Sequence, residues 1–367
     1  MMTCIPLKQL KRFLFSVALS FSLLAALPVE ADESPVTTAS IIEQTLTTIY
    51  QPRFAQFALV TLRHDEAAQA YCANPSHGTL TRLYKEFESV VASFSAIELY
   101  RVGPLLQVNR QNRLFYWPDK RRVVERQLRT LLAGLTNNTL SVDDLSQKSV
   151  ALQGLPALER LLFGKNAAQR LLAGSETNNC ELIIAIADNV NTMAVAINAD
   201  WQADSLLVQS ILHPESGSDY FRDDKEVLRS IVTQIIVGVD VVLNRKIASL
   251  HGNDAGIKKA PLWRSEQSLS MISNNLESLR ALTVDSGLAR ATNLGNELAF
   301  EFRIAGQMVQ KLIDLPSLID EHGNLSADAQ SLVRALSAVV GGIKDTLNDR
   351  FTQALGIRVG FNSEDGD

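Results

Sequence analysis

The 367-residue chain contains 46% hydrophobic and 20% charged residues, which is enough apolar sequence for a large core. Its length predicts about two domains. The formal net charge is −5 at pH 7 and there is no long basic stripe, so the sequence argues against nucleic acid as a partner.

Residues 1–31 have the features of a secretory signal peptide. A basic start precedes the apolar run 13–27, and the small-residue site Val29-Glu30-Ala31 follows it. The apolar run is short for a membrane span. We therefore expect cleavage near residue 31 and a soluble periplasmic protein with no membrane span after cleavage.

Two cysteines remain in the expected mature chain, Cys72 and Cys180. Cysteine pairs usually form disulfides in an oxidising compartment. Two cysteines alone are a weak signal for a metal site, so we predict a structural Cys72–Cys180 bridge.

Apolar residues recur at helical spacing along most of the chain. The expected helices of the first half cover residues 37–50, 53–73, 79–100 and 118–132, with a break or kink at Pro52 and a start at Pro118. Those of the second half cover residues 183–201, 227–250, 266–282, 286–315 and 326–355. No alternating strand pattern is visible. The fold prediction is all-α, with two packed helical-bundle domains at residues 32–180 and 181–361 and a disordered tail at 362–367.

The stretch Val150–Gly164 holds one acidic residue, Glu159, in an apolar setting. Glutamate is rarely buried unless it is paired, so Glu159 is expected to face the interior or a cleft. Pro156 fits the first turn of a helix that begins near Leu155. The interpretations are a capped core helix whose glutamate faces a cleft, a ligand site that uses Glu159, and an intact metal centre.

The segment Gly154–Glu159 resembles the G-x-H-x-x-E box of the imelysin family, periplasmic helical proteins that are linked to iron uptake and were once assigned as metallopeptidases. The resemblance extends to three further segments, Tyr100–Pro104, Trp117–Asp119 and Arg264–Ser270. Pro156 stands where the family has its histidine. The resemblance implies two packed bundle-like halves from an old duplication, although no clear repeat is visible in this sequence.

The resemblance also implies a binding site. Its candidate residues are Glu159, Arg101, Asp119, Ser265 and Glu266. We expect all of them except Ser265, for which we make no such prediction, to converge in one cleft between the bundles. Their carboxylates suit ferric or divalent ions, and the arginine suits a carboxylate or another small anionic ligand. Iron is compatible with this set but not required, and no metal ligands are assigned. The alternative is a buried ion-pair network that needs no ligand.

Other motifs are weaker. No two of the five histidines lie three or four residues apart, and no nucleophile motif is visible. We predict a solvated helix face for His64-Asp65-Glu66 and a turn at His322. The local basic cluster is also predicted to be a solvated face, with an anionic partner as the alternative; its members are Lys120, Arg121, Arg122, Arg126 and Arg129.

The sequence therefore predicts an exported imelysin-like binding or accessory protein in iron- or haem-related uptake. Its expected partners are other periplasmic or outer-membrane iron-uptake proteins. One alternative is a metallopeptidase, but Pro156 removes the histidine that would hold the metal, so we expect no peptidase activity. The other alternative is a structural or interaction protein with a vestigial site.

Overall fold

Helices dominate the part of the chain that the computed structural model describes, residues 37–135, 142–173, 177–251 and 256–357. No strand occurs in these ranges, only an isolated bridge between Ile319 and Leu325. The all-α prediction is confirmed. The predicted signal peptide and the tail at 362–367 lie outside the described residues.

The helices of the first 212 residues are α1 (Thr38–Gln44), α2 (Gln51–Ala73), α3 (His77–Ser95), α4 (Arg110–Leu114), α5 (Val123–Gly134), α6 (Val142–Ser146), α7 (Leu155–Leu162), α8 (Ala167–Leu172), α9 (Thr177–Asp200) and α10 (Leu206–Leu212). Those that follow are α11 (Asp224–Val241), α12 (Ala248–Leu250), α13 (Ser268–Arg280), α14 (Leu288–Ala291), α15 (Gly295–Ile313), α16 (Ala327–Thr346) and α17 (Thr352–Leu355). Four π-helical turns extend these helices: Thr45–Tyr50, Val242–Ile247, Ala281–Asp285 and Leu347–Phe351.

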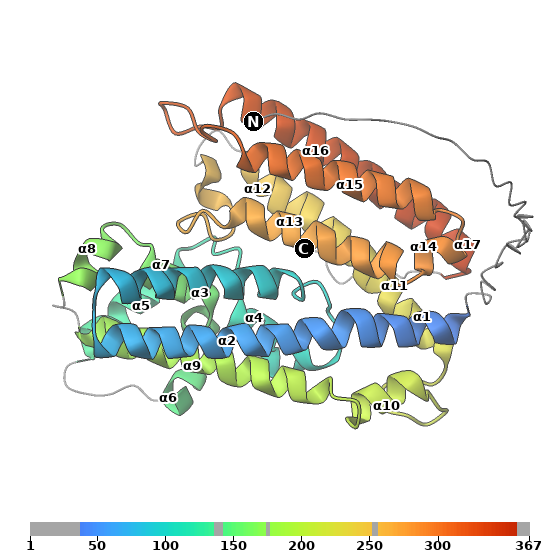
Figure 1. Ribbon diagram of the computed structural model, residues 1–367, viewed down its shortest axis with the longest axis horizontal. Coiled ribbons are helices and arrows are strands. Elements are labelled where there is room, and N and C mark those ends of the chain that lie inside the picture. Colours follow the sequence, from blue (N-terminus) through green and yellow to red (C-terminus); the bar gives the residue numbers. More distant parts are fainter. Residues whose placement is uncertain (1–36, 136–141, 174–176, 252–255, 358–367) are drawn as a thin grey trace, which may run out of the picture. The chain divides into compact units, whose positions relative to one another are not determined.

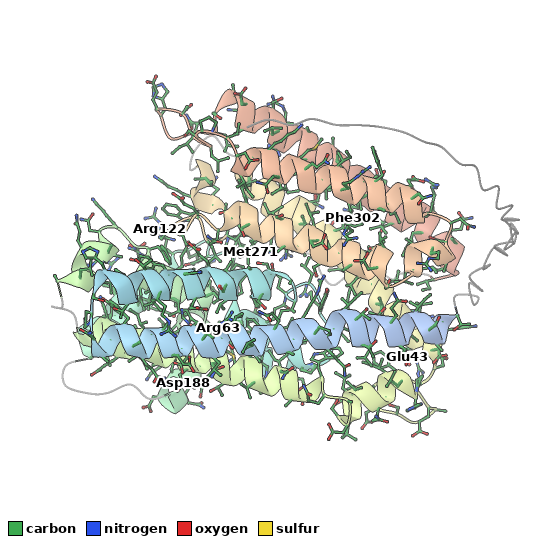
Figure 2. All side chains as sticks on the ribbon, viewed as in Figure 1. Glu43, Arg63, Arg122, Asp188, Met271 and Phe302 are labelled. Atoms are coloured by element: carbon green, nitrogen blue, oxygen red, sulfur yellow. A yellow bond between two sulfur atoms is a disulfide. The ribbon has the colours of Figure 1, made fainter. Side chains whose placement is uncertain are left out.

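Two groups of long helices organise the described residues (Figure 1). In the first group α2 packs against α3 and α9, and in the second α15 packs against α13 and α16. Contacts of α13 with α3 and of α11 with α1 join the groups. Buried residues such as Met271 and Phe302, both labelled in Figure 2, belong to a hydrophobic core that is continuous across both groups.

Helices α2 and α9 form an antiparallel pair. The contacts between them include the disulfide Cys72–Cys180 and a hydrogen bond from Thr61 to Asn191, and directly after α9 Trp201 stacks on Phe54 of α2 with ring centroids 4.9 Å apart. The residue numbers of each pair add up to nearly the same value, as they must when two helices run in opposite directions. The predicted disulfide is confirmed.

Helix α9 is long and apolar enough, by length and composition, to cross a membrane over Asn179–Asp200. Its apolar stripe is buried in the core, as the spacing predicts: Ile183, Ile186, Val190, Met193, Ile197 and Trp201. This burial against α2 and α7 accounts for the apolar sequence. Helix α9, which begins near the predicted domain boundary at residue 180, packs on helices that precede it. The division into domains at residues 32–180 and 181–361 stays a prediction.

Four predicted helix boundaries are wrong. Pro52 neither breaks nor ends the first helix, because the π-helical turn Thr45–Tyr50 leads directly into α2 and leaves the proline in its first turn. Pro118, whose peptide bond with Trp117 is cis, does not begin the next helix. The carboxylate of Asp119 accepts hydrogen bonds from the backbone N–H groups of Val123 and Val124, and α5 begins there.

The other two differences lie at turns. The helix predicted over residues 79–100 ends at Ser95. The helix predicted over 286–315 is interrupted because Gly287 and Asn293 both take positive φ, 90° and 60°. A residue in this left-handed conformation cannot continue a right-handed helix, so α14 and α15 are separate.

The prediction for His64-Asp65-Glu66 is also wrong. His64 is 1% exposed and Asp65 is 6% exposed, whereas Glu66 is exposed. The imidazole lies on the core side of α2, with its ring centroid 6.1 Å from that of Phe87. The turn prediction for His322 is confirmed, because the residue lies in an exposed turn that Asp320 caps.

Candidate functional site

Helix α7 begins immediately after Gly154, with Pro156 in its first turn as predicted. A Cβ atom at Gly154 would lie 2.2 Å from the carbonyl oxygen of Leu114 at the end of α4. No side chain fits at that distance. The glycine of the box is therefore required by the close approach of two backbones, and this contact fixes where α7 starts.

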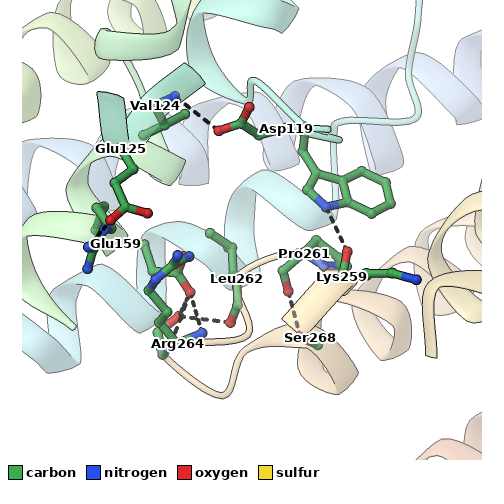
Figure 3. A network of polar contacts seen from close by, with 12 residues as sticks. Asp119, Val124, Glu125, Glu159, Lys259, Pro261, Leu262, Arg264 and Ser268 are labelled. Atoms are coloured by element: carbon green, nitrogen blue, oxygen red, sulfur yellow. Dashed lines mark hydrogen bonds and ion pairs between the residues drawn. The ribbon is translucent and has the colours of Figure 1, made fainter. Parts of the chain in front are cut away.

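Glu159 lies on α7 and is 3% exposed. Its Oε1 accepts hydrogen bonds from the backbone N–H of Arg264 at 2.7 Å, the backbone N–H of Ser265 at 3.0 Å and the hydroxyl of Ser265 at 3.2 Å (Figure 3). Its Oε2 is 3.6 Å from the Arg264 guanidinium. The carboxylate thus fastens α7 to the turn before α13.

The turn that meets Glu159 is held in an unusual conformation. Leu262 and Glu266 both take positive φ, 49° and 61°. The hydroxyl of Ser268 donates to the carbonyl of Pro261 at 2.6 Å and closes the turn. Successive N–H groups that converge in such a turn form an anion-binding concavity, and here the side chain of Glu159 occupies it.

Burial is the largest influence on the ionisation of this pair. It raises the pKa of Glu159, while the hydrogen bonds from Ser265 and the charge and backbone of Arg264 act in the opposite direction. Burial likewise lowers the pKa of Arg264, and Glu159 opposes that change. Every donor aimed at the Glu159 carboxylate favours its ionised form and so opposes the effect of burial.

A second carboxylate, Glu125 on α5, lies beside this pair (Figure 3). It accepts a hydrogen bond from Arg160 at 2.9 Å, and Arg129 lies 3.7 Å from the same oxygen. The hydrogen bond from Arg160 holds the pKa of Glu125 below its ordinary value, and the charges of Arg264 and Arg122 add to this effect. The guanidinium of Arg264 also lies over the Trp263 ring, 4.5 Å from its centroid.

The structure brings together two of the predicted site residues, Glu159 and Ser265. Arg264, and not Arg101, is the cation that pairs with Glu159. Arg101 is half-buried in the segment after α3. The carboxylate of Asp119 caps α5, and Glu266 is exposed on the turn before α13. A binding role for these residues stays a prediction.

The residues that the sequence prediction missed are Glu125, Arg160 and Arg264. Two of them are sequence neighbours of predicted residues, since Arg160 follows Glu159 and Arg264 precedes Ser265. The available signal was that acidic and basic residues follow each other closely in each segment, Glu159 and Arg160 in one and Arg264 and Glu266 in the other. The basic residues that precede and begin α5, including Arg122, Arg126 and Arg129, are exposed, which agrees with the predicted solvated face and also with its alternative, an anionic partner.

Few side chains at this site could act as ligands to a metal ion. Within the described ranges no group of three or more His, Cys, Asp and Glu residues is placed to hold a metal ion. Pro156 supplies no ligand, and Oε1 of Glu159 already accepts three hydrogen bonds. The arrangement is suited to joining helices and to presenting guanidinium groups.

Known proteins give the family. The sequence pattern of the imelysin family, peptidase family M75, matches residues 50–350. An imelysin-like protein from Psychrobacter arcticum has a similar structure, with a TM-score of 0.67, 17% identity, and coverage of 89% of this chain and 98% of that one. A protein from Parabacteroides distasonis described as a putative iron-regulated protein A precursor also has a similar structure, with a TM-score of 0.64 and 13% identity. The match covers 88% of this chain and 98% of that one. No curated protein matches the sequence. The match over residues 50–350 covers most of the chain, and the protein belongs to the imelysin family.

Proposed function

We propose that this protein is an exported binding or accessory component of iron- or haem-related uptake and is not a peptidase. Its family membership supports the proposal, as does the structural likeness to a protein described as an iron-regulated precursor. The basic and apolar start of the sequence supports export to the periplasm. Its partners are then other periplasmic or outer-membrane proteins of iron uptake.

The observation that carries the proposal is that both carboxylate oxygens of Glu159 already have partners within the protein. In a metallopeptidase, a carboxylate of this box has to hold a metal or activate its bound water. Here Oε1 accepts three hydrogen bonds from the turn before α13, and Oε2 pairs with Arg264. The residue that precedes it by one helical turn is Pro156, which has no ligand atom. Glu159 therefore joins segments of the protein and leaves the neighbouring arginines to meet a ligand.

The ligand site of the proposal lies at the junction of α5, α7 and the turn before α13. These elements come from different halves of the sequence, and sites in helical proteins commonly form between facing helices. Iron is cargo in this proposal and arrives as a chelate or as haem. Ser265 belongs to the site through its bonds to Glu159, while Arg101, Asp119 and Glu266 remain its predicted outer members.

The test uses purified protein that begins at residue 32 and carries its disulfide. It is incubated with ferric citrate or titrated with haemin, and bound iron is measured by elemental analysis and haem by visible absorption. We expect close to one equivalent of one of these ligands per chain and no cleavage of denatured casein with or without added zinc. Retention of neither iron nor haem would leave a structural or interaction protein with a vestigial site. Chelator-sensitive cleavage of casein would establish the peptidase alternative.

A further inference from the structure

We propose that three arginines grouped around Glu125, namely Arg122, Arg160 and Arg264, bind the carboxylate groups of an anionic ligand. We call these three residues the arginine cluster. The inference rests on the proposed function and deepens it, because it assigns recognition to the acidic groups of the ligand and not to a bare metal ion.

The residues around Glu125 and Glu159 carry a surplus of positive charge. Four arginines, the cluster and Arg129, lie near two carboxylates, those of Glu125 and Glu159, which leaves a surplus of two positive charges. Exposed basic residues in the same stretch, Lys120, Arg121 and Arg126, add to it. The carboxylate of Asp119 is the acidic group of that turn, and it caps α5. A site with this balance repels a free cation and attracts an anion.

The guanidinium groups of the arginine cluster repel one another. The charge of Arg160 lowers the pKa of Arg264, although burial is the larger cause, so the two guanidinium groups are close enough to disfavour each other. Glu125 bonds to Arg160 at 2.9 Å and relieves only part of this repulsion. An anion placed between the two groups would relieve the rest.

Arg160 and Arg264 are held in place by neighbouring side chains and remain accessible to solvent. The side chains of Arg160 and Arg264 are 26% and 25% exposed, so each is anchored but still reachable from solvent. Arg264 lies over the Trp263 ring, and its side-chain ionic partner in the described ranges is Glu159, reached through one terminal nitrogen. A guanidinium has five N–H donors in a planar fork, so Arg264 keeps donors for a ligand.

These features select the chemical class of the ligand. Planar guanidinium groups recognise carboxylates through two parallel hydrogen bonds, and a fixed pair of them suits a ligand with more than one carboxylate. Two sources of iron have this chemistry: a citrate-type chelate, and haem through its propionates. Phosphate shares the charge but lacks the paired planar acids.

The experiment is isothermal titration of the protein from residue 32 onward with sodium citrate, ferric citrate, haemin and sodium phosphate, at constant ionic strength. The variants are Arg160→Gln and Glu125→Gln, with Arg303→Gln on α15 as a control that removes an exposed positive charge outside the cluster. We expect Arg160→Gln to weaken binding about tenfold, the effect of losing one charged hydrogen bond. Glu125→Gln is expected to tighten binding several-fold because it removes the anion that competes for Arg160. Arg303→Gln is expected to change binding less than twofold, since its charge is distant and screened.

The opposite signs of the two variants separate ligand recognition from structural support. If both variants weaken binding, or neither changes it, the arginine cluster does not hold the ligand. Since Glu125 is partly exposed, its variant remains informative even if Arg160→Gln fails to fold. Binding of ferric citrate or haemin that is indifferent to both variants would overturn the inference and leave the proposed function standing. Equal binding of citrate and ferric citrate, with haemin unbound, would support the cluster and contradict the proposed function. If phosphate binds as well as the carboxylates, the ligand class is wrong.

Discussion

The protein buries two glutamates where segments from its two halves meet, and it treats them differently. Glu98, in the turn after α3, pairs with Lys246 of the π-helical turn Val242–Ile247 and accepts a hydrogen bond from Asn275 of α13 at 2.7 Å. Lys246 also donates to Asn275 at 2.7 Å and lies over the Phe115 ring. All three polar partners are buried, and Lys246 is 1% exposed.

Glu159 is as deeply buried as Glu98, but its surroundings are open on one side. Its donors are two backbone N–H groups, the hydroxyl of Ser265 and the partly exposed Arg264. The members of the network around Glu98 hydrogen-bond to one another and are buried, so the network holds helices in register. The network around Glu159 ends in arginines with donors to spare. Exposure of the cationic partner to solvent, and not burial of the carboxylate, therefore separates a structural pair from a candidate binding site.

The strongest test of the enclosed network is Lys246→Met. Removing one member of a buried pair leaves the other charge unpaired, and the expected loss in the free energy of unfolding is about 3 to 5 kcal/mol. Burial lowers the pKa of Lys246, and the charge and hydrogen bond of Glu98 oppose that change. Urea denaturation of the variant measures the loss.

The double variant Glu98→Gln/Lys246→Met is the control. It removes both charges and leaves no uncompensated ion, so it should be less destabilised than Lys246→Met alone. If the single variant lost less than about 1 kcal/mol, the net worth of a typical hydrogen bond, the pair would not be essential to the register.

His64 extends the comparison to a buried ionisable group whose Nε2 has no hydrogen-bond partner in the described ranges. Burial lowers the pKa of His64 to about 4. As pH falls below the ordinary histidine value of about 6.5, the unfolded chain takes up a proton that the folded protein refuses until about pH 4, so stability is lost in this window. The loss between pH 7 and pH 5 is about 2 kcal/mol.

The variant His64→Leu should remove that loss. Burial raises the pKa of the neighbouring Asp65 to about 6, which has the opposite effect on stability, but Asp65 titrates in both proteins and cancels from their difference. The measurement is urea unfolding of both proteins at pH 7, 6 and 5. A difference in stability that stays constant over this range would mean that His64 takes up its proton at the same pH in the folded and unfolded states.

Much of the fold was predictable because helical spacing reports which side of a helix is buried. The same spacing also contained the signal that His64 and Lys246 are buried, whereas their polarity alone was misleading. His64 is four residues from Val60 and from Ala68, both buried on α2, and Lys246 is four residues from the buried Val242 and Leu250. Each stands on an apolar stripe, so the pattern contained the signal for burial.

The site was less predictable because its geometry depends on turns. Glu159 and Ser265 could be named from the resemblance, and Glu159 is buried as its apolar neighbours suggested. Its partners are backbone N–H groups that converge only because Leu262 and Glu266 take positive φ. Neither residue favours that conformation, so no local propensity announces it. The choice of Arg264 over Arg101 as the partner of Glu159 follows from this turn.

Glu159→Gln tests the open network. The amide oxygen can keep the bonds from Arg264 and Ser265, but those bonds lose their charge assistance and Arg264 loses its ion pair. Relief of the desolvation of Glu159 offsets part of this cost, so the expected loss in unfolding free energy is about 1 to 2 kcal/mol. Thermal and urea unfolding measure it. A loss as large as that of Lys246→Met would mean that the two networks are equally structural.

The smallest expected effect is that of Glu266→Gln, and it completes the comparison. Glu266 is a neighbour of Ser265 on the same turn, yet it is exposed and makes no hydrogen bond or ion pair to Glu159. Surface substitutions of this kind change the free energy of unfolding by less than about 0.5 kcal/mol. Since Glu266 takes φ of 61° and glutamine has the same branching at Cβ, the backbone strain is the same in both proteins. A loss near that of Glu159→Gln, measured in the same urea series, would show that Glu266 belongs to the buried network and that access does not separate the two kinds of glutamate.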